Sequence, residues 1–86
     1  MANILNIKQG LAQRVRIRRR EVRISQLELA ERSGVSLGSI KRFEGIGEIS
    51  LINLLRIAVV LGYEADFDQL FARKNYQSLD ELINAK

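Results

Sequence analysis

The sequence predicts a compact all-α domain of five or six helices, and three observations support this prediction. Apolar residues recur at three- and four-residue spacing, and no segment shows the alternating pattern of a strand. Serine stands where helices are expected to begin, and glycine stands where they are expected to end. The chain has 86 residues and no Pro, which suits one domain rather than two.

The first predicted helix runs from Ile4 to Glu21. Within it, Ile4, Ile7, Leu11 and Val15 follow the spacing of one helix face. This face is expected to pack on the rest of the domain.

The second predicted helix, Gln26–Ser33, is short. Ser25 and Glu28 have the spacing of a capping box, in which each side chain satisfies the other residue's backbone amide. Gly34 supplies a left-handed end.

The third predicted helix, Leu37–Glu44, begins after Ser36 and is expected to end at Gly45. Only three residues separate it from the second helix, which is the arrangement of a helix-turn-helix. At about 100° per residue, Ile40 and Phe43 share one side. The opposite side carries a glycine and two cations and suits close approach to a nucleic acid, although it could be a merely solvated face: Gly38, Lys41 and Arg42.

The fourth predicted helix, Leu51–Leu61, lies between Ser50 and Gly62 and is apolar nearly all round. It is therefore expected at the centre of the domain or in a subunit interface. A further short helix is expected over Asp66–Phe71, and another after Ser78. Residues 1–62 are interpreted as the helix-turn-helix domain, and residues 63–86 as an extension within the same compact unit.

Composition narrows the functional classes. Without Cys or His, the chain lacks the commonest metal ligands and the commonest general base, and its acids show no catalytic arrangement. We expect no enzyme activity, no cofactor and no metal. No apolar run is long enough for a membrane span, and the N-terminus does not resemble a signal peptide, so we expect a cytoplasmic protein.

The positive charge is concentrated in the first quarter of the chain. Residues 1–24 carry a net charge of +6, while the whole chain carries +4. Such a cluster suits either binding to a phosphate backbone or a solvated surface.

Residues 7–62 resemble the Cro/phage-repressor type of helix-turn-helix regulators, the XRE family. The resemblance depends on Ser25-Gln26-x-x-Leu29-Ala30, with Gly-Val-Ser beginning nine residues after that serine. It implies a five-helix, phage-repressor-like domain in a bacterial transcriptional regulator. Such a regulator binds palindromic operators in double-stranded DNA as a homodimer, usually as a repressor, and is nucleoid-associated when bound.

The resemblance also implies roles for individual residues. Gln26 matches a residue that contacts the DNA backbone and braces the recognition helix. The positions expected to reach base edges are Leu37, Gly38 and Arg42. Those expected to touch phosphates or bases are Ser36, Ser39 and Lys41. Arg19 and Glu44 match an internal ion pair, for which we favour a structural role.

Two departures from the family pattern affect the expected DNA contacts. Leu37 and Gly38 replace amide side chains, so bidentate adenine recognition from these positions is excluded. The loop Gly45–Ile49 contains Glu48 and no basic residue. Phosphate contacts in this loop must therefore come from backbone amides.

The extension resembles the ends of HipB-like antitoxins encoded beside HipA-like toxin kinases. This gives a second hypothesis, in which the chain is an interaction module that neutralises such a kinase and also regulates its own operon. Residues 63–86 can serve dimerisation, a toxin-like partner or the domain's own core, and the sequence leaves these three uses open.

Overall fold

The computed structural model describes residues 3–74, in which the elements follow the order α1 (Ile4–Glu21), α2 (Gln26–Ser33), α3 (Leu37–Ile46), α4 (Leu51–Leu61) and η1 (Glu64–Gln69). Four of these are α-helices, and η1 is a 3-10 helix. No strand occurs within residues 3–74, so the all-α fold class is confirmed. The helix expected after Ser78 lies outside the described residues.

Side-chain caps begin the four α-helices. The hydroxyl oxygens of Ser25, Ser36 and Ser50 each accept the N–H of the third residue beyond, at 3.0, 3.1 and 3.2 Å. The amide oxygen of Asn3 accepts the N–H of Asn6 at 2.8 Å and caps α1, a cap that was not predicted. Each bond satisfies a backbone donor that the helix itself leaves unpaired.

Left-handed glycines end α2, α3 and α4. Gly34 and Gly62 do so as predicted, with φ of 75° and 82°. The end predicted at Gly45 was wrong, because α3 continues through it to Gly47, where φ is 77°. Nothing lies within 4 Å of a Cβ placed on Gly45, whereas one on Gly47 would lie 3.0 Å from the backbone of Lys8. Close approach of α1 therefore helps to require a glycine at Gly47.

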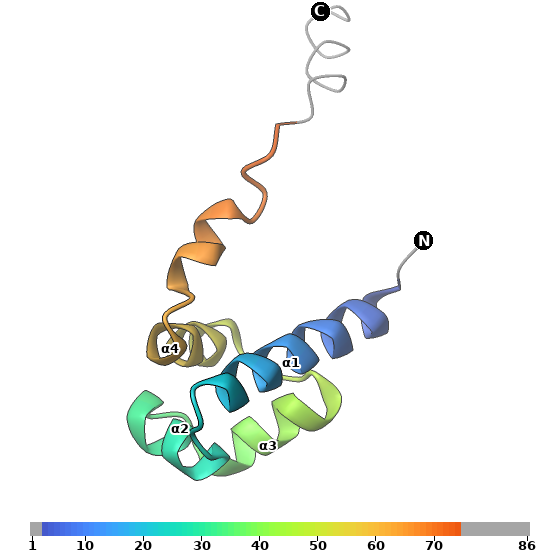
Figure 1. Cartoon of the computed structure of the whole chain (residues 1–86). Coiled ribbons are helices and arrows are strands. Elements are labelled where there is room, and N and C mark those ends of the chain that lie inside the picture. Colours follow the sequence, from blue (N-terminus) through green and yellow to red (C-terminus); the bar gives the residue numbers. More distant parts are fainter. Residues whose placement is uncertain (1–2, 75–86) are drawn as a thin grey trace, which may run out of the picture.

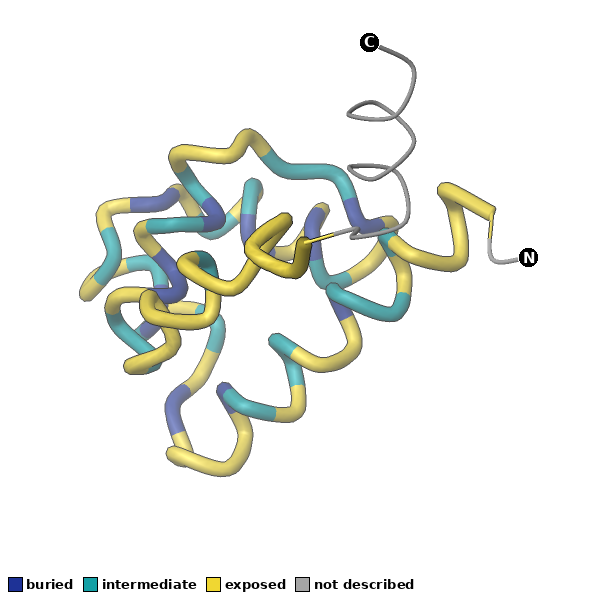
Figure 2. Tube along the Cα trace, turned by 90° about the horizontal axis from the view of Figure 1, so that it is seen from above, coloured by how far each residue is buried: buried dark blue, intermediate teal, exposed yellow. Residues whose placement is uncertain are grey.

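The helices surround a small apolar core. In Figure 1, α1 crosses above α3, while α2 packs against both α3 and α4. Buried residues gather where these four helices face one another, and the segment after α4 is largely exposed (Figure 2). The core consists of two groups: Ile24, Leu29, Val35, Ile40 and Ile57, and then Ala12, Phe43 and Leu54.

The end of the described chain packs more loosely than the core. The short helix expected over Asp66–Phe71 is shifted by two residues: η1 covers Glu64–Gln69, so Leu70 and Phe71 lie outside it. Phe67 from η1 contacts the second core group and is only half-buried. Beyond it, Phe71 is fully exposed and adopts a left-handed φ of 58°.

Helix α4 divides its apolar side chains between the interior and the surface. Leu54, Ile57 and Ala58 are buried, whereas Ile52 and Val59 are 58% and 60% exposed. The helix therefore reaches the core along one side only. Its other side leaves apolar area in solvent.

Candidate nucleic-acid interface

Buried side chains at the turn between α2 and α3 position the two helices. Leu29 of α2 and Ile40 of α3 are fully buried in one core group, and Val35 between the helices is 2% exposed. The N–H of Val35 donates to the hydroxyl oxygen of Ser33 at 3.1 Å. Each fully buried aliphatic side chain contributes about 1.5–3 kcal/mol, so the core and the local bond together fix this turn.

Helix α3 presents one side to solvent and the other to the core. Ile40 and Phe43 are buried, while Gly38, Lys41 and Arg42 are exposed. This is the division expected from the helical spacing. A further glycine, seven residues after Gly38 and on the same exposed side, lies within the helix because α3 is longer than predicted: Gly45. Gly45 was not predicted as part of this surface, although its seven-residue spacing from Gly38 is the signal that would have found it.

The first turn of α3 carries the two serines expected near DNA. The Ser36 hydroxyl caps the helix and donates to the Ser39 hydroxyl oxygen at 2.8 Å. Ser36 is exposed, whereas Leu37 and Ser39 are half-buried. The positive end of the helix dipole lies at this turn, which favours an anion such as phosphate.

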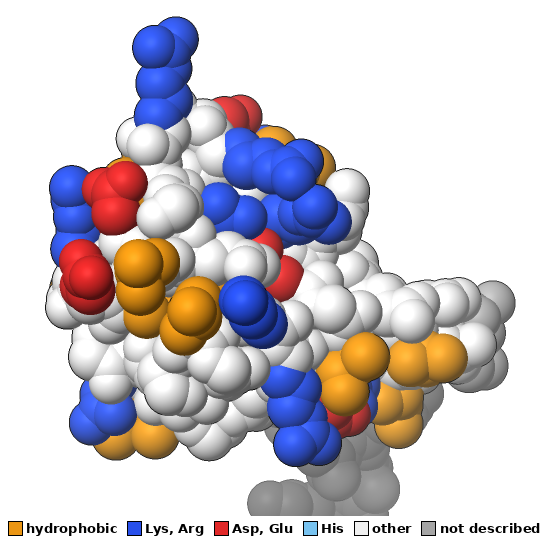
Figure 3. Space-filling view, turned by 90° about the horizontal axis from the view of Figure 1, so that it is seen from below, with side chains coloured by type: hydrophobic (Ala, Val, Ile, Leu, Met, Phe, Trp, Pro, Cys, Tyr) orange, Lys and Arg blue, Asp and Glu red, His pale blue; other side chains and the backbone are white. Residues whose placement is uncertain are grey.

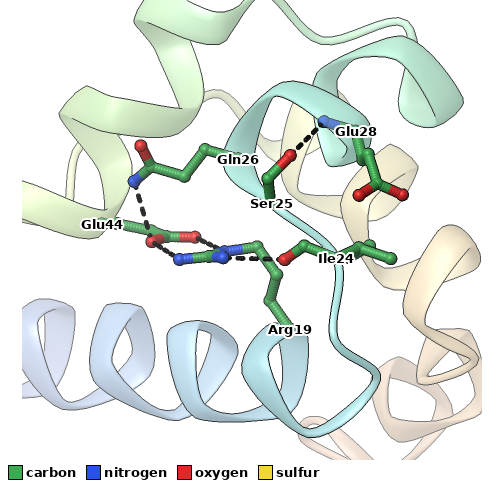
Figure 4. Close-up of polar contacts among 6 residues, drawn as sticks. All are labelled: Arg19, Ile24, Ser25, Gln26, Glu28 and Glu44. Atoms are coloured by element: carbon green, nitrogen blue, oxygen red, sulfur yellow. Dashed lines mark hydrogen bonds and ion pairs between the residues drawn. The ribbon is translucent and has the colours of Figure 1, made fainter.

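An ion pair connects α1 to α3 behind this exposed side. Nε and Nη2 of Arg19 donate to the two carboxylate oxygens of Glu44 at 2.8 and 2.9 Å (Figure 4). Only 8% of the Arg19 side chain and 3% of the Glu44 side chain are exposed. The two-pronged geometry is the strong form of a guanidinium–carboxylate contact.

Two further hydrogen bonds extend this ion pair to the start of α2. Arg19 also donates from Nη1 to the carbonyl oxygen of Ile24 at 2.9 Å, and Gln26 donates from Nε2 to Glu44 at 3.0 Å. Figure 4 shows the resulting group of side chains bringing together α1, α2 and α3. The Ile24 carbonyl was not among the predicted partners, because a backbone acceptor leaves no mark in residue type.

The same contacts set the protonation of Glu44. Burial alone would raise the pKa of this carboxyl, but the hydrogen bonds from Arg19 and Gln26 and the charges of Arg19 and Arg16 outweigh it, so the pKa lies below its ordinary value. The hydrogen bond to Glu44 raises the pKa of Arg19 against the effect of its own burial. Both groups are charged at neutral pH.

Only the first half of the predicted capping box at α2 is present among the described residues. Ser25 accepts the Glu28 N–H, but the Glu28 carboxylate lies 3.5 Å from Nη2 of Arg32 instead of bonding back to Ser25. Arg32 lies one helical turn further along the same helix. An exposed pair of this kind contributes little to stability.

Several basic side chains lie on the face that carries the helix-turn-helix (Figure 3). Figure 3 views the molecule from the side occupied by α2 and α3 in Figure 1, and Lys and Arg side chains gather across it. Lys41 and Arg42 belong to α3 and are exposed. Arg16 belongs to α1, and its positive charge helps to lower the pKa of Glu44. Arg20 in the last turn of α1 and Arg23 just after that helix are also exposed, and the sequence predicted no contact for either.

The loop after α3 borders a polar hollow of about 300 Å³, lined by Ser39, Arg42, Glu48, Ile49, Ser50 and Asn53. Glu48 pairs with the ammonium group of Lys8 from α1. The pair offsets the negative charge that would oppose phosphate at this loop. The phosphate backbone of DNA can therefore approach this loop, although the loop contains Glu48.

The structure thus brings all nine of the site residues predicted from the sequence to two adjoining places. At the exposed side and first turn of α3 lie Ser36, Leu37, Gly38, Ser39, Lys41 and Arg42. Behind them lie Arg19, Gln26 and Glu44. Their roles toward DNA stay predictions.

A short exposed helix on a basic face, braced by buried side chains from two other helices, defines a helix-turn-helix DNA-binding domain. Residues 15–67 match the sequence profile described as helix-turn-helix. The chain belongs to this family, of the Cro/repressor or XRE type, and is a DNA-binding transcriptional regulator. The chain matches none of the curated proteins and none of the solved structures compared with it. None of the described helices is both long and apolar enough to cross a bilayer.

Proposed function

We propose that the protein is a transcriptional repressor that binds a palindromic operator as a homodimer and regulates its own gene. The observation that carries this proposal is the exposed side of α3, where Gly38, Lys41 and Arg42 stand free of the core. The Arg19–Glu44 pair holds that helix on α1. A rigid recognition helix limits the entropy lost when DNA binds.

A second copy is needed for a palindrome, and the outer side of α4 supports self-association. Ile52 and Val59 are seven residues apart, lie on one side of the helix and are more than half exposed. Burying apolar area of this kind drives protein association. Two copies related by a two-fold axis would present their recognition helices to half-sites about 34–36 Å apart.

The test is fluorescence anisotropy with DNA from upstream of the protein's own gene. We expect sequence-specific binding that falls steeply between 50 and 200 mM salt, because basic side chains release counterions from phosphates. Inserting about half a helical turn between the half-sites should abolish tight binding, while a full turn should restore part of it. Salt-independent binding, or equal affinity for all spacings, would contradict the proposal.

The second candidate function is that of an antitoxin-type module that neutralises a HipA-like kinase. It is favoured by Phe71, a large aromatic side chain that is fully exposed just after η1. Aromatic side chains of this kind dominate many protein–protein interfaces. Co-expression with such a kinase tests it: the kinase should co-purify with the wild-type chain and not with Phe71→Asp, while Leu27→Asp on α2 serves as an exposed control. Equal recovery with both variants would remove Phe71 from the interface.

A further inference from the structure

An apolar groove of about 630 Å³ lies between α1, α4 and η1. Its walls include Ile7 and Leu11 from α1, Leu51 from α4, and Leu70 just after η1. Ile7, Leu51 and Leu70 are 58%, 66% and 60% exposed. Exposed apolar area gathered in one groove marks a site of contact.

The groove lies apart from the recognition helix. Ala12 and Arg19 are on the side of α1 that packs on α3. The groove is lined by another stripe of α1 at helical spacing: Ile7, Leu11, Arg14 and Arg18. None of the described residues that line it belongs to α2 or α3. A molecule seated in the groove therefore leaves the exposed side of α3 free for DNA.

Phe71 directly follows the groove residue Leu70 but does not line the groove. Its side chain is fully exposed, and its φ of 58° is left-handed, which costs free energy for a residue with a side chain. Conformations of this kind persist mainly at functional positions. Figure 1 shows the segment after η1 leading away from the four α-helices. The aromatic ring thus stands beside a groove that the described residues leave open.

We propose that the groove receives Phe71 of the partner subunit in a homodimer, while its own Phe71 enters the partner's groove. Ring and groove are adjacent on one chain, so a single two-fold axis beside them satisfies both at once. Such a reciprocal contact closes at two subunits, whereas a head-to-tail contact continues into a ring or a filament. This inference rests on the homodimer proposed above and names its contact.

Charge complementarity favours a second copy as the occupant. The α1 wall of the groove carries Arg14 and Arg18. The η1 segment, which precedes Phe71, has three acids and no base: Glu64, Asp66 and Asp68. Two bases follow Phe71, and η1 of the partner subunit offers them the same acids: Arg73 and Lys74. Opposite charges at the edge of an apolar contact fix its register.

The area that a dimer needs sets the extent of the contact. A specific interface buries at least about 1,200 Å² in total, and one aromatic side chain contributes about 150–250 Å². The two rings therefore account for less than half of this area. The exposed rim residues Ile7, Leu51 and Leu70 must be buried in the same contact.

Sedimentation equilibrium of the full-length chain without DNA tests the proposal over a micromolar concentration range. We expect Phe71→Asp to raise the dimer dissociation constant at least about tenfold, as loss of an aromatic anchor does. Leu27→Asp is the matched control, since Leu27 is an apolar residue of α2 that is 53% exposed, and it should leave the constant unchanged. Circular dichroism confirms that each variant is folded.

Three outcomes of the sedimentation measurement would overturn the proposal. A wild-type chain that stays monomeric would do so, and so would unchanged association of Phe71→Asp, which would leave Phe71 for a different protein. A loss in Val59→Asp with none in Phe71→Asp would assign self-association to the outer side of α4. Because no DNA is present, these failures leave operator binding to be decided separately by the anisotropy titration.

Cysteine cross-linking locates the contact with Phe71 intact, because the natural sequence has no Cys and gives no background. Ala72→Cys and Ile7→Cys are made in separate chains and mixed under mild oxidation, so that a mixed disulfide must join two molecules. Ala72→Cys mixed with Leu27→Cys is the control. We expect the first pair to cross-link at least about tenfold faster, since the dimer holds its cysteines at a high effective concentration. Equal rates for the two pairs would overturn the proposal.

Discussion

Arg19 and Glu44, 25 residues apart in the chain, form a buried two-pronged ion pair that links α1 to the recognition helix. Around this pair, the start of α2 is held by the Ile24 carbonyl and the Gln26 amide. Among the described residues, no buried side-chain nitrogen or oxygen atom of Arg19 or Glu44 lacks a hydrogen-bond partner. This complete pairing is the condition under which buried charges are tolerated.

Glu44→Gln should lower the free energy of unfolding by about 3–5 kcal/mol, because it leaves the Arg19 guanidinium buried without its counter-charge. Denaturant titration followed by circular dichroism measures the loss. Glu28→Gln is the matched control, since Glu28 and Arg32 form an exposed pair that is worth less than about 1 kcal/mol. Equal losses in the two variants would mean that Arg19 and Glu44 behave as a solvated pair.

The same carboxylate should make stability depend on pH. Because the folded pKa of Glu44 is below its ordinary value of 4.5, the folded state binds the proton less readily than the unfolded state. Its stabilising contribution is therefore complete above about pH 4.5 and is lost as the pH falls through the folded pKa. Unfolding titrations of the wild type and Glu44→Gln should converge over this acidic range. A difference that stays constant would contradict this origin.

Local signals in the sequence account for most of the fold. Serine caps and glycine ends depend on residues only a few positions apart, so α2 and α4 were predicted with their observed bounds. The end of α3 was not, because a contact between Gly47 and Lys8, far away in the chain, contributes to it. Spacing alone could not distinguish Gly45 from Gly47.

The candidate site likewise has one part that could be predicted from the sequence and another that could not. The exposed side of α3 follows from the helical angle between Gly38, Lys41 and Arg42, which the sequence contains. The Arg19–Ile24 bond and the pair between Lys8 and Glu48 depend on the packing of α1 against other segments. Residue types alone do not determine such contacts.

Gly38→Ala should separate stability from DNA binding. No atom lies within 4 Å of the position of the new methyl group, and a helical glycine costs up to about 1 kcal/mol relative to alanine, so the free protein should gain stability. Operator affinity should fall, because the methyl group would stand between α3 and the base edges. Thermal melts and anisotropy titrations measure the two effects.

Gly45→Ala is the control for that experiment. It also adds a methyl group in open space on the exposed side of α3, but about 10 Å further along the helix. It should gain stability without the same loss of affinity, since the first turns of a recognition helix make the base contacts. Unchanged operator binding by Gly38→Ala would show that α3 does not approach DNA closely there.

Arg42→Ala and Lys41→Ala should differ in how strongly they weaken binding to the operator relative to random DNA. Arg42 can offer two donors to guanine, so its loss should cost about 1–3 kcal/mol on the operator and much less on random DNA. Loss of a phosphate contact from Lys41 should weaken both DNAs about equally and lower the salt slope by about one. Parallel titrations on operator and random duplexes decide this. Equal weakening of both by Arg42→Ala would exclude base reading by that side chain.

Gly47→Ala should destabilise the protein more than Gly62→Ala does. Both glycines are left-handed, with φ of 77° and 82°, so each alanine incurs a backbone cost of about 1–2 kcal/mol. At Gly62 the new Cβ meets nothing within 4 Å, whereas at Gly47 it lies 3.0 Å from the backbone of Lys8. Relieving that overlap must move α1 away from the end of α3, which typically costs a further 1–3 kcal/mol, roughly. Denaturant titration of the two variants measures the difference, and equal losses would show that α1 yields freely at Lys8.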